Sequence, residues 1–321
     1  MYFAAELAIA CPGRDEEKLV LHAETDETRK AKLMLVLLSI GWGITWPMMK
    51  FALLEIPPMS MRVGSAGVGA LVVCLTAMLR GRSMRIPRSG WLHIAIGGAL
   101  NIVGFSLFSA YAQLSAATSR VAILAYTMPI WSAVLARLVL GEALTTRRQI
   151  ALALCVAGLS VLIYPLAQHG VPFGILLATG AGLSWAAGTV YLKWAEVEAS
   201  PIAIAGWQIV VGFLIMAACL PVFEGGVHLW PASGRALFGV VFTGVIGSGF
   251  AYVLWFEIIR VLPATTAALG ALSAPVIGVV SSMVILGERP TLSDAVGFGL
   301  IFLASACVLV PPQPLKNVGT A

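Results

Sequence analysis

The chain has 321 residues, of which 59% are apolar and only 11% are charged. A soluble domain carries roughly 25% charged residues and cannot bury this much apolar surface in one core. The composition therefore excludes a soluble globular protein and indicates a membrane protein. The net charge of +5 does not indicate a nucleic-acid binder, because the basic residues lie at the ends of apolar runs and form no patch interleaved with aromatic residues.

The first 31 residues differ from the rest of the chain. A short apolar start lacks the basic residues of a signal peptide and is too short to span a membrane. The stretch that follows, up to Lys32, is charged and polar. We therefore expect residues 1–31 to form a mostly disordered cytoplasmic tail.

Beyond this tail, ten apolar runs are each about long enough to cross a bilayer as a helix. They lie at 33–54, 59–79, 91–113, 118–140, 146–164, 173–194, 202–223, 236–259, 264–286 and 292–310. The gaps between them are too short for a soluble domain, and the alternation typical of membrane β-barrels is absent. The sequence predicts an all-α integral membrane protein with ten transmembrane helices.

The basic residues predict how the chain is oriented. With the N-terminus in the cytoplasm, most Lys and Arg of the first five spans lie on the cytoplasmic side, including Arg80, Arg82 and Arg85 after the second span. An even number of spans then returns the C-terminal tail, residues 312–321, to the cytoplasm. We expect a multi-pass protein of the inner (plasma) membrane.

An internal repeat is visible around two prolines. Pro129 is followed by Leu140–Gly141–Glu142, and Pro275 is followed by Leu286–Gly287–Glu288, at one constant offset. Since each predicted half has five helices, the second half must enter the membrane from the opposite side. Such inverted repeats enclose a central binding site in many secondary transporters.

Two five-helix halves that each end in a proline-containing helix and a Leu-Gly-Glu turn resemble the EamA branch of the drug/metabolite transporter superfamily. The layout is most similar to the YddG-type exporters of aromatic amino acids. This resemblance implies a first repeat at 32–165, a second at 172–311, and export of amino acids or related metabolites from the cytoplasm.

The first predicted helix carries a stripe of candidate cavity residues. Trp42, Trp46 and Lys50 are spaced four apart and so share one helix face. A tryptophan near mid-membrane needs a partner for its N–H, so Trp42 and Trp46 either line a wet cavity or pack between helices. Pro47 interrupts the same helix and is a candidate bend.

Other helices add polar and aromatic candidates for the same cavity. Asn101 is a strongly polar side chain near the middle of the third helix, where such a group either binds solute or joins helices. The remaining candidates for the cavity are Phe105, Tyr111, Trp185, Gln208, Ser248 and Tyr252.

The repeated prolines and the Leu-Gly-Glu turns have predicted mechanical roles. Pro129 and Pro275 each remove a helix hydrogen bond, which makes them candidate hinges together with Pro47. Gly141–Glu142 and Gly287–Glu288 follow helix C-termini, where a carboxylate is disfavoured by the helix dipole. We expect both glutamates to be held locally, by a backbone N–H or by an arginine such as Arg147, as clamps of the adjoining turns.

The favoured function is a carrier that exports aromatic or hydrophobic amino acids by alternating access. A carrier of another small solute, such as a drug-like compound, a nucleobase or a polar amino acid, is the alternative. An intramembrane enzyme is a remote third, because no nucleophile–base pair or metal-ligand motif lies within the spans. We expect no cofactor or metal, no nucleic-acid partner, and a monomer that binds its small-molecule substrate within the bilayer.

Overall fold

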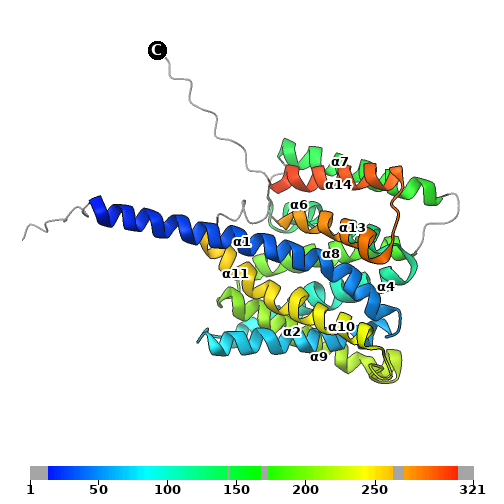
Figure 1. Cartoon of the computed structure of the whole chain (residues 1–321), viewed down its shortest axis with the longest axis horizontal. Helices are drawn as coiled ribbons and strands as arrows, with labels where there is room; N and C mark the ends of the chain where they lie inside the picture. Colours follow the sequence, from blue (N-terminus) through cyan, green and yellow to red (C-terminus); the bar gives the residue numbers. More distant parts are fainter. Residues whose placement is uncertain (1–13, 143–144, 168–172, 263–270, 310–321) are drawn as a thin grey trace, which may run out of the picture.

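A computed structural model describes residues 14–142, 145–167, 173–262 and 271–309 of the chain (Figure 1). Within these ranges the structure is helical and has no strand. The N-terminal half (residues 32–165) and the helix that leads into it contain α1 Arg14–Leu53, α2 Pro58–Leu79, η1 Arg88–Gly90, α3 Trp91–Gly97, η2 Gly98–Gly104, α4 Phe105–Ser115, α5 Thr118–Ala125, α6 Met128–Val139 and α7 Thr146–Ala167. The C-terminal half (residues 172–311) contains α8 Phe173–Ala195, α9 Pro201–Glu224, α10 Gly234–Phe242, η3 Thr243–Phe250, α11 Ala251–Val261, α13 Ser273–Leu286 and α14 Leu292–Leu309.

Several of these elements run on into one another as single rods. The segments η1, α3, η2 and α4 together span 88–115, and α10, η3 and α11 together span 234–261. In the described part of the chain, seven helical stretches are long and apolar enough to cross a membrane: 26–53, 58–79, 88–115, 118–139, 173–195, 201–224 and 234–255. Three shorter apolar helices, 149–165, 273–286 and 292–307, coincide with the remaining predicted spans. The protein is therefore an all-helical, multi-span membrane protein, and the count of ten crossings stays a prediction.

The first helix begins earlier than expected. The sequence suggests a mostly disordered tail up to residue 31, whereas α1 already begins at Arg14. The segment 14–31 is rich in Glu, Lys, Leu and Ala and contains no Gly or Pro, so its residues favour a helix that extends the apolar part of α1. Residues 1–13 lie outside the described part of the chain.

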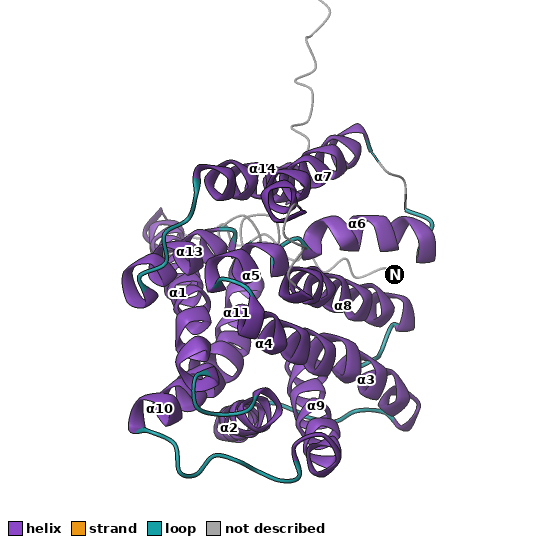
Figure 2. Ribbon diagram, turned by 90° about the vertical axis from the view of Figure 1, so that its right-hand side faces the viewer, coloured by secondary structure: helices purple, strands orange, loops and turns teal. Residues whose placement is uncertain are grey.

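The two halves are interleaved in space. Helix α1 of the N-terminal half packs against α13, α10 and α11 of the C-terminal half, while α8 packs against α4, α5 and α6. The pair α7 and α14 forms a layer along one side of the bundle (Figures 1 and 2). The centre of the bundle is therefore built from helices of both halves.

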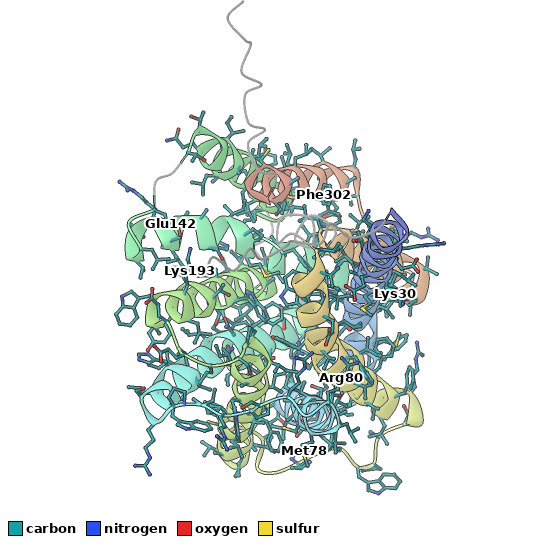
Figure 3. All side chains as sticks on the ribbon, turned by 90° about the vertical axis from the view of Figure 1, so that its left-hand side faces the viewer. Lys30, Met78, Arg80, Glu142, Lys193 and Phe302 are labelled. Carbon is teal, nitrogen blue, oxygen red and sulfur yellow. The ribbon has the colours of Figure 1, made fainter. Side chains whose placement is uncertain are left out.

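The bundle has two ends, which we name by residues. At the Leu53 end, α1, α9 and α13 end and α2, α5, α10 and α14 begin. Figure 2 looks onto this end, and Figure 3 looks onto the opposite one, the Arg80 end. At the Arg80 end, Lys193 and Glu142 form an exposed ion pair, with Nζ and Oε1 2.6 Å apart (Figure 3).

Both Leu-Gly-Glu turns have the same backbone geometry. Gly141 and Gly287 have φ angles of 70° and 69°, a left-handed conformation in which glycine is favoured over other residues. The N–H of each following glutamate donates back into its helix, Glu142 to Ala136 O and Glu288 to Ser282 O. This is the glycine-dependent way of ending a helix, and it accounts for the glycine in both turns.

Candidate functional site

A cavity of about 140 Å³ lies at the centre of the bundle, where helices of both halves meet. Its walls are aromatic, and hydroxyl, amide and guanidinium groups interrupt them. The aromatic lining residues are Trp42, Trp46, Phe105, Tyr126, Trp185 and Tyr252. The polar lining residues are Thr45, Arg62, Ser65, Asn101, Ser106, Thr243 and Ser248. An amphipathic solute with a ring matches this combination.

Most of the side chains predicted for the cavity lie around it. Trp42, Trp46, Asn101, Phe105, Trp185, Ser248 and Tyr252 all line it, whereas Tyr111 and Gln208 do not. Tyr111 is six positions beyond Phe105 on the same helix, so it points to another face. Gln208 lies behind Asn101 as its hydrogen-bond partner. A role for these residues in substrate binding remains a prediction.

The aromatic walls are held in place by contacts between helices. Trp42 Nε1 donates to Gly247 O of η3 at 3.3 Å, and the rings of Trp46 and Tyr126 lie 6.5 Å apart. On the opposite wall, Phe105 and Trp185 meet edge to face with centroids 5.1 Å apart. The N–H of Trp42 therefore has a hydrogen-bond acceptor, and the faces of these aromatic rings still line the cavity.

Two π-helical segments form the middle of the site. The segments η2 and η3 occupy corresponding rods of the two halves, and both contribute lining residues, among them Asn101 and Ser248. A π-helical turn widens the helix and loosens its hydrogen bonding, and such turns are frequent at functional sites. Nothing in the residue pattern indicated this feature, because the hydropathy of both segments matches an ordinary helix.

Asn101 joins the two halves at the back of the cavity. Its Nδ2 donates to Gln208 Oε1 at 2.8 Å, and Gln208 Nε2 donates to Ile204 O, which fixes the orientation of both amides. Asn101 is 7% exposed, and its Oδ1 has no hydrogen-bond partner in the described structure. The sequence suggests two roles for Asn101, binding solute or joining helices. The structure shows the contact that joins helices, and the same side chain also borders the cavity.

Arg62 is the charged lining residue that the sequence analysis missed. Its position near the start of α2 suggests a basic residue at the membrane surface, but its side chain is 8% exposed and turns into the cavity. Its Nη2 donates to Ser109 Oγ at 2.8 Å and lies 2.6 Å from Met49 Sδ. The contact that places Arg62 in the cavity is with Ser109 of α4. Residue spacing along α2 alone cannot predict a contact with another helix.

Glutamates close the Leu53 end by capping helices of the opposite half. Helices α2 and α5 follow Pro57 and Ala117, which offer no capping side chain. Glu224 instead accepts from the N–H groups of Met59 and Ser60 at 2.8 Å each. An outside carboxylate thus supplies the acceptor that the first turn of a helix needs.

Glu288 makes the equivalent contact with α5. It accepts from the N–H groups of Thr118 at 2.6 Å and Ser119 at 2.9 Å. The expectation of a local clamp of the adjoining turn is therefore wrong for Glu288, because the nearest unpaired N–H groups belong to a helix start in the N-terminal half. Glu142 pairs with Lys193, likewise far along the chain, and the side chain of Arg147 lies outside the described structure.

Further bonds across the halves strengthen the Leu53 end. Arg120 of α5 forms a two-bond pair with Asp294 of α14, at 2.6 and 3.0 Å. Glu55 accepts from the N–H and the hydroxyl of Ser233, the residue that caps α10, and these bonds lower the pKa of the Glu55 carboxyl. The Leu53 end is therefore closed by ionic and capping contacts between the halves.

The prolines lie at or beside breaks in hydrogen bonding. Pro47 lies inside α1, and Ser281 Oγ donates at 3.4 Å to Gly43 O, the carbonyl that this proline leaves without a helical partner. Pro129 follows a break between α5 and α6, and Pro275 lies near the start of α13. A hinge role for the three prolines remains a prediction.

Comparisons with known proteins identify the family. The sequence pattern of the EamA-like transporter family matches residues 29–164 and again residues 172–310. The chain belongs to the EamA-like transporter family. Each of the two matched segments of this family member contains one Leu-Gly-Glu motif.

Relatives of this EamA-like protein have similar lengths. It is 24% identical to the transporter YoaV of Bacillus subtilis over 84% of this chain and 94% of YoaV. It is 27% identical to the Bacillus subtilis transporter YvbV over 88% and 92% of the two chains. A probable amino-acid metabolite efflux pump of Salmonella typhimurium is 22% identical over 85% and 93%. These relatives indicate a transporter rather than an enzyme.

A solved crystal structure shares the fold. It aligns with a TM-score of 0.60 over 87% of this chain and 97% of the other, at 22% identity. At that identity the likeness concerns the fold alone. Among the described residues no three His, Cys, Asp or Glu side chains cluster in a way that would hold a metal ion.

Proposed function

We propose that this EamA-like transporter exports aromatic and hydrophobic amino acids and related metabolites across the inner membrane by alternating access. The observation that carries the proposal is the central cavity, in which Trp42, Trp46, Phe105 and Trp185 offer ring surfaces beside hydroxyl and amide groups. Aromatic faces bind aromatic and apolar solutes, and a few polar groups fix their orientation. The name of the Salmonella typhimurium relative, a probable amino-acid metabolite efflux pump, supports the same class of substrate.

The proposed mechanism uses two inverted five-helix halves with ten crossings. The repeated family match, the paired π-helical segments and the identical Leu-Gly-Glu turns support this arrangement. Near-equivalent halves make the two access states similar in energy, as alternating access requires. Both termini are cytoplasmic in this proposal, so the Leu53 end faces outward. One chain lines the cavity, so a monomer suffices.

The test is uptake of labelled phenylalanine, tryptophan, threonine and glycine into proteoliposomes that contain the purified full chain, with and without a pH gradient. We expect saturable uptake that favours phenylalanine and tryptophan. Uptake of none of the four would remove the amino-acid assignment and favour a drug-like compound or a nucleobase. Preference for threonine or glycine over the aromatic pair would contradict the proposed role of the aromatic walls.

Replacing one aromatic wall should weaken this uptake. Trp185→Leu removes the ring that packs edge to face against Phe105 in the same wall of the cavity, while an apolar side chain remains. We expect the apparent affinity for phenylalanine to fall by about threefold to tenfold, the effect of one lost aromatic contact. The matched control is Trp230→Leu, since Trp230 is 81% exposed and lies outside the cavity. Equal effects of the two substitutions on affinity would contradict the assignment.

A further inference from the structure

Arg62 is a buried cation in the wall of the cavity. It lies in the second turn of α2, within the membrane-crossing stretch 58–79. Its side chain is 8% exposed and borders the cavity together with Met49 and Ser65. A guanidinium does not give up its proton in proteins, so this position carries a positive charge even where water is scarce.

No anion in the described part of the chain neutralises this charge. The partners of Nη2 are a serine hydroxyl and a methionine sulfur, and Nε has no hydrogen-bond partner. The carboxylates of the Leu53 end are already engaged by other groups. Glu224 caps the start of α2 and Glu288 caps the start of α5. Asp294 pairs with Arg120, and Glu55 accepts from Ser233. A buried charge without a partner is unfavourable, so the cavity offers a strong site for an anionic group brought in by a ligand.

We infer that Arg62 binds the carboxylate of the transported solute, an inference that rests on the proposed function of the cavity. The planar guanidinium forms paired hydrogen bonds with a carboxylate, which fixes orientation as well as charge. With the carboxylate at Arg62, the apolar body of the solute extends along Trp46 and toward Trp185. The substrate class is therefore organic carboxylates with an aromatic or apolar body.

The lining residues also indicate which charged group of an amino acid matters more for binding, the carboxylate or the ammonium group. The described lining residues include no Asp or Glu to pair with an ammonium group. Among the described lining residues, the buried acceptors without a hydrogen-bond partner are neutral, Asn101 Oδ1 and Thr243 Oγ1. The carboxylate is therefore required for binding and the ammonium group is dispensable, so deaminated analogues such as aryl-substituted acids belong to the same substrate class.

Three ligands that share one ring test this ranking: phenylalanine, 3-phenylpropionate without the ammonium group, and phenethylamine without the carboxylate. Binding of each to the purified full chain is measured by calorimetry in detergent, beside competition for phenylalanine uptake into proteoliposomes. We expect 3-phenylpropionate to bind within about threefold of phenylalanine and phenethylamine to bind at least about tenfold more weakly. Phenethylamine binding as tightly as 3-phenylpropionate would overturn the inference.

Variants at Arg62 assign the preference to this side chain. Arg62→Met keeps much of the volume and removes the charge, so we expect the preference for 3-phenylpropionate over phenethylamine to disappear. Arg62→Lys keeps the charge but loses the paired hydrogen bonds of the guanidinium, so it should retain part of the preference. Arg289→Met, at an exposed position of the Leu53 end, is the control and should keep all of it. A preference that persists in folded Arg62→Met would also overturn the inference.

The outcomes separate this inference from the proposed function. If none of the three ligands binds and phenylalanine is not taken up, the amino-acid assignment fails and the inference fails with it. If phenylalanine is taken up but phenethylamine competes equally, the proposed function stands and only the role of Arg62 is overturned. The ligand series uses the unmodified chain, so it decides the question even where Arg62→Met does not fold.

Discussion

Gly188→Ala is expected to destabilise the protein by up to about 2 kcal/mol, because forcing extra volume into a packed interior usually costs about 1–3 kcal/mol. Gly188 lies on α8, where an added Cβ would overlap Asn101 Oδ1 and come within 3.0 Å of Leu100 Cβ. Asn101 cannot turn away at low cost, because its amide is fixed by Gln208. The better helix propensity of alanine, worth about 1 kcal/mol, offsets only part of this.

Thermal unfolding of the detergent-purified chain measures the effect. The matched control is Gly299→Ala on α14, where a Cβ would meet no atom within 4 Å, so we expect no loss of stability there. In an Asn101→Ala background, Gly188→Ala should cost much less, because the overlapping oxygen is gone. An equal cost in both backgrounds would show that the contact with Asn101 does not limit the approach of α8.

Features of the fold and the site that depend on local sequence patterns could be predicted, whereas features that depend on contacts between distant residues could not. Apolar length placed the helical stretches well, because a bilayer demands about 20 apolar residues wherever a chain crosses it. Helical spacing placed Trp42 and Trp46 on one face, and both border the cavity. Tyr111 was not chosen by spacing, and it does not border the cavity, because six positions beyond Phe105 place it on another face of the helix.

Features that depend on contacts between distant segments of the chain could not be predicted from the sequence. Arg62 resembles a basic residue that reaches the headgroups until Ser109 and Met49 are seen beside it. The glutamate of the Leu-Gly-Glu motif is disfavoured by the dipole of its own helix, so the sequence predicts that it needs a partner. Its partner, the start of α5, lies 169 and 170 positions away along the chain, beyond any local pattern. The π-helical segments depend on packing in the same way.

Glu288→Gln is expected to weaken the closure of the Leu53 end by about 2 kcal/mol. The carboxylate accepts from Thr118 N and Ser119 N, and charged hydrogen bonds of this kind are worth about 1.5–3 kcal/mol. An amide keeps the shape but removes the charge that complements the N-terminus of α5. It also presents an NH₂ group to one of the two backbone donors, so one bond is replaced by a repulsive contact.

Two measurements show whether the contact between Glu288 and α5 breaks when the Leu53 end opens. Thermal unfolding of Glu288→Gln should show the lost stability, while Glu198→Gln, at an exposed position, should change it by less than about 0.5 kcal/mol. In a cysteine-free background, Ser248→Cys places a thiol in the cavity wall. Its labelling rate by an impermeant maleimide, applied from the Leu53 side, then reports how often that end is open.

If this contact breaks each time the Leu53 end opens, about 2 kcal/mol shifts the equilibrium toward the open form by roughly 30-fold. Labelling should rise by a similar factor in Glu288→Gln and stay unchanged in Glu198→Gln. A loss of stability without faster labelling would mean that α5 and the end of α13 move together as one body. Opening at this end would then depend on other contacts between the halves. The most similar ones are the bonds that Glu224 accepts from the start of α2 and that Glu55 accepts from Ser233.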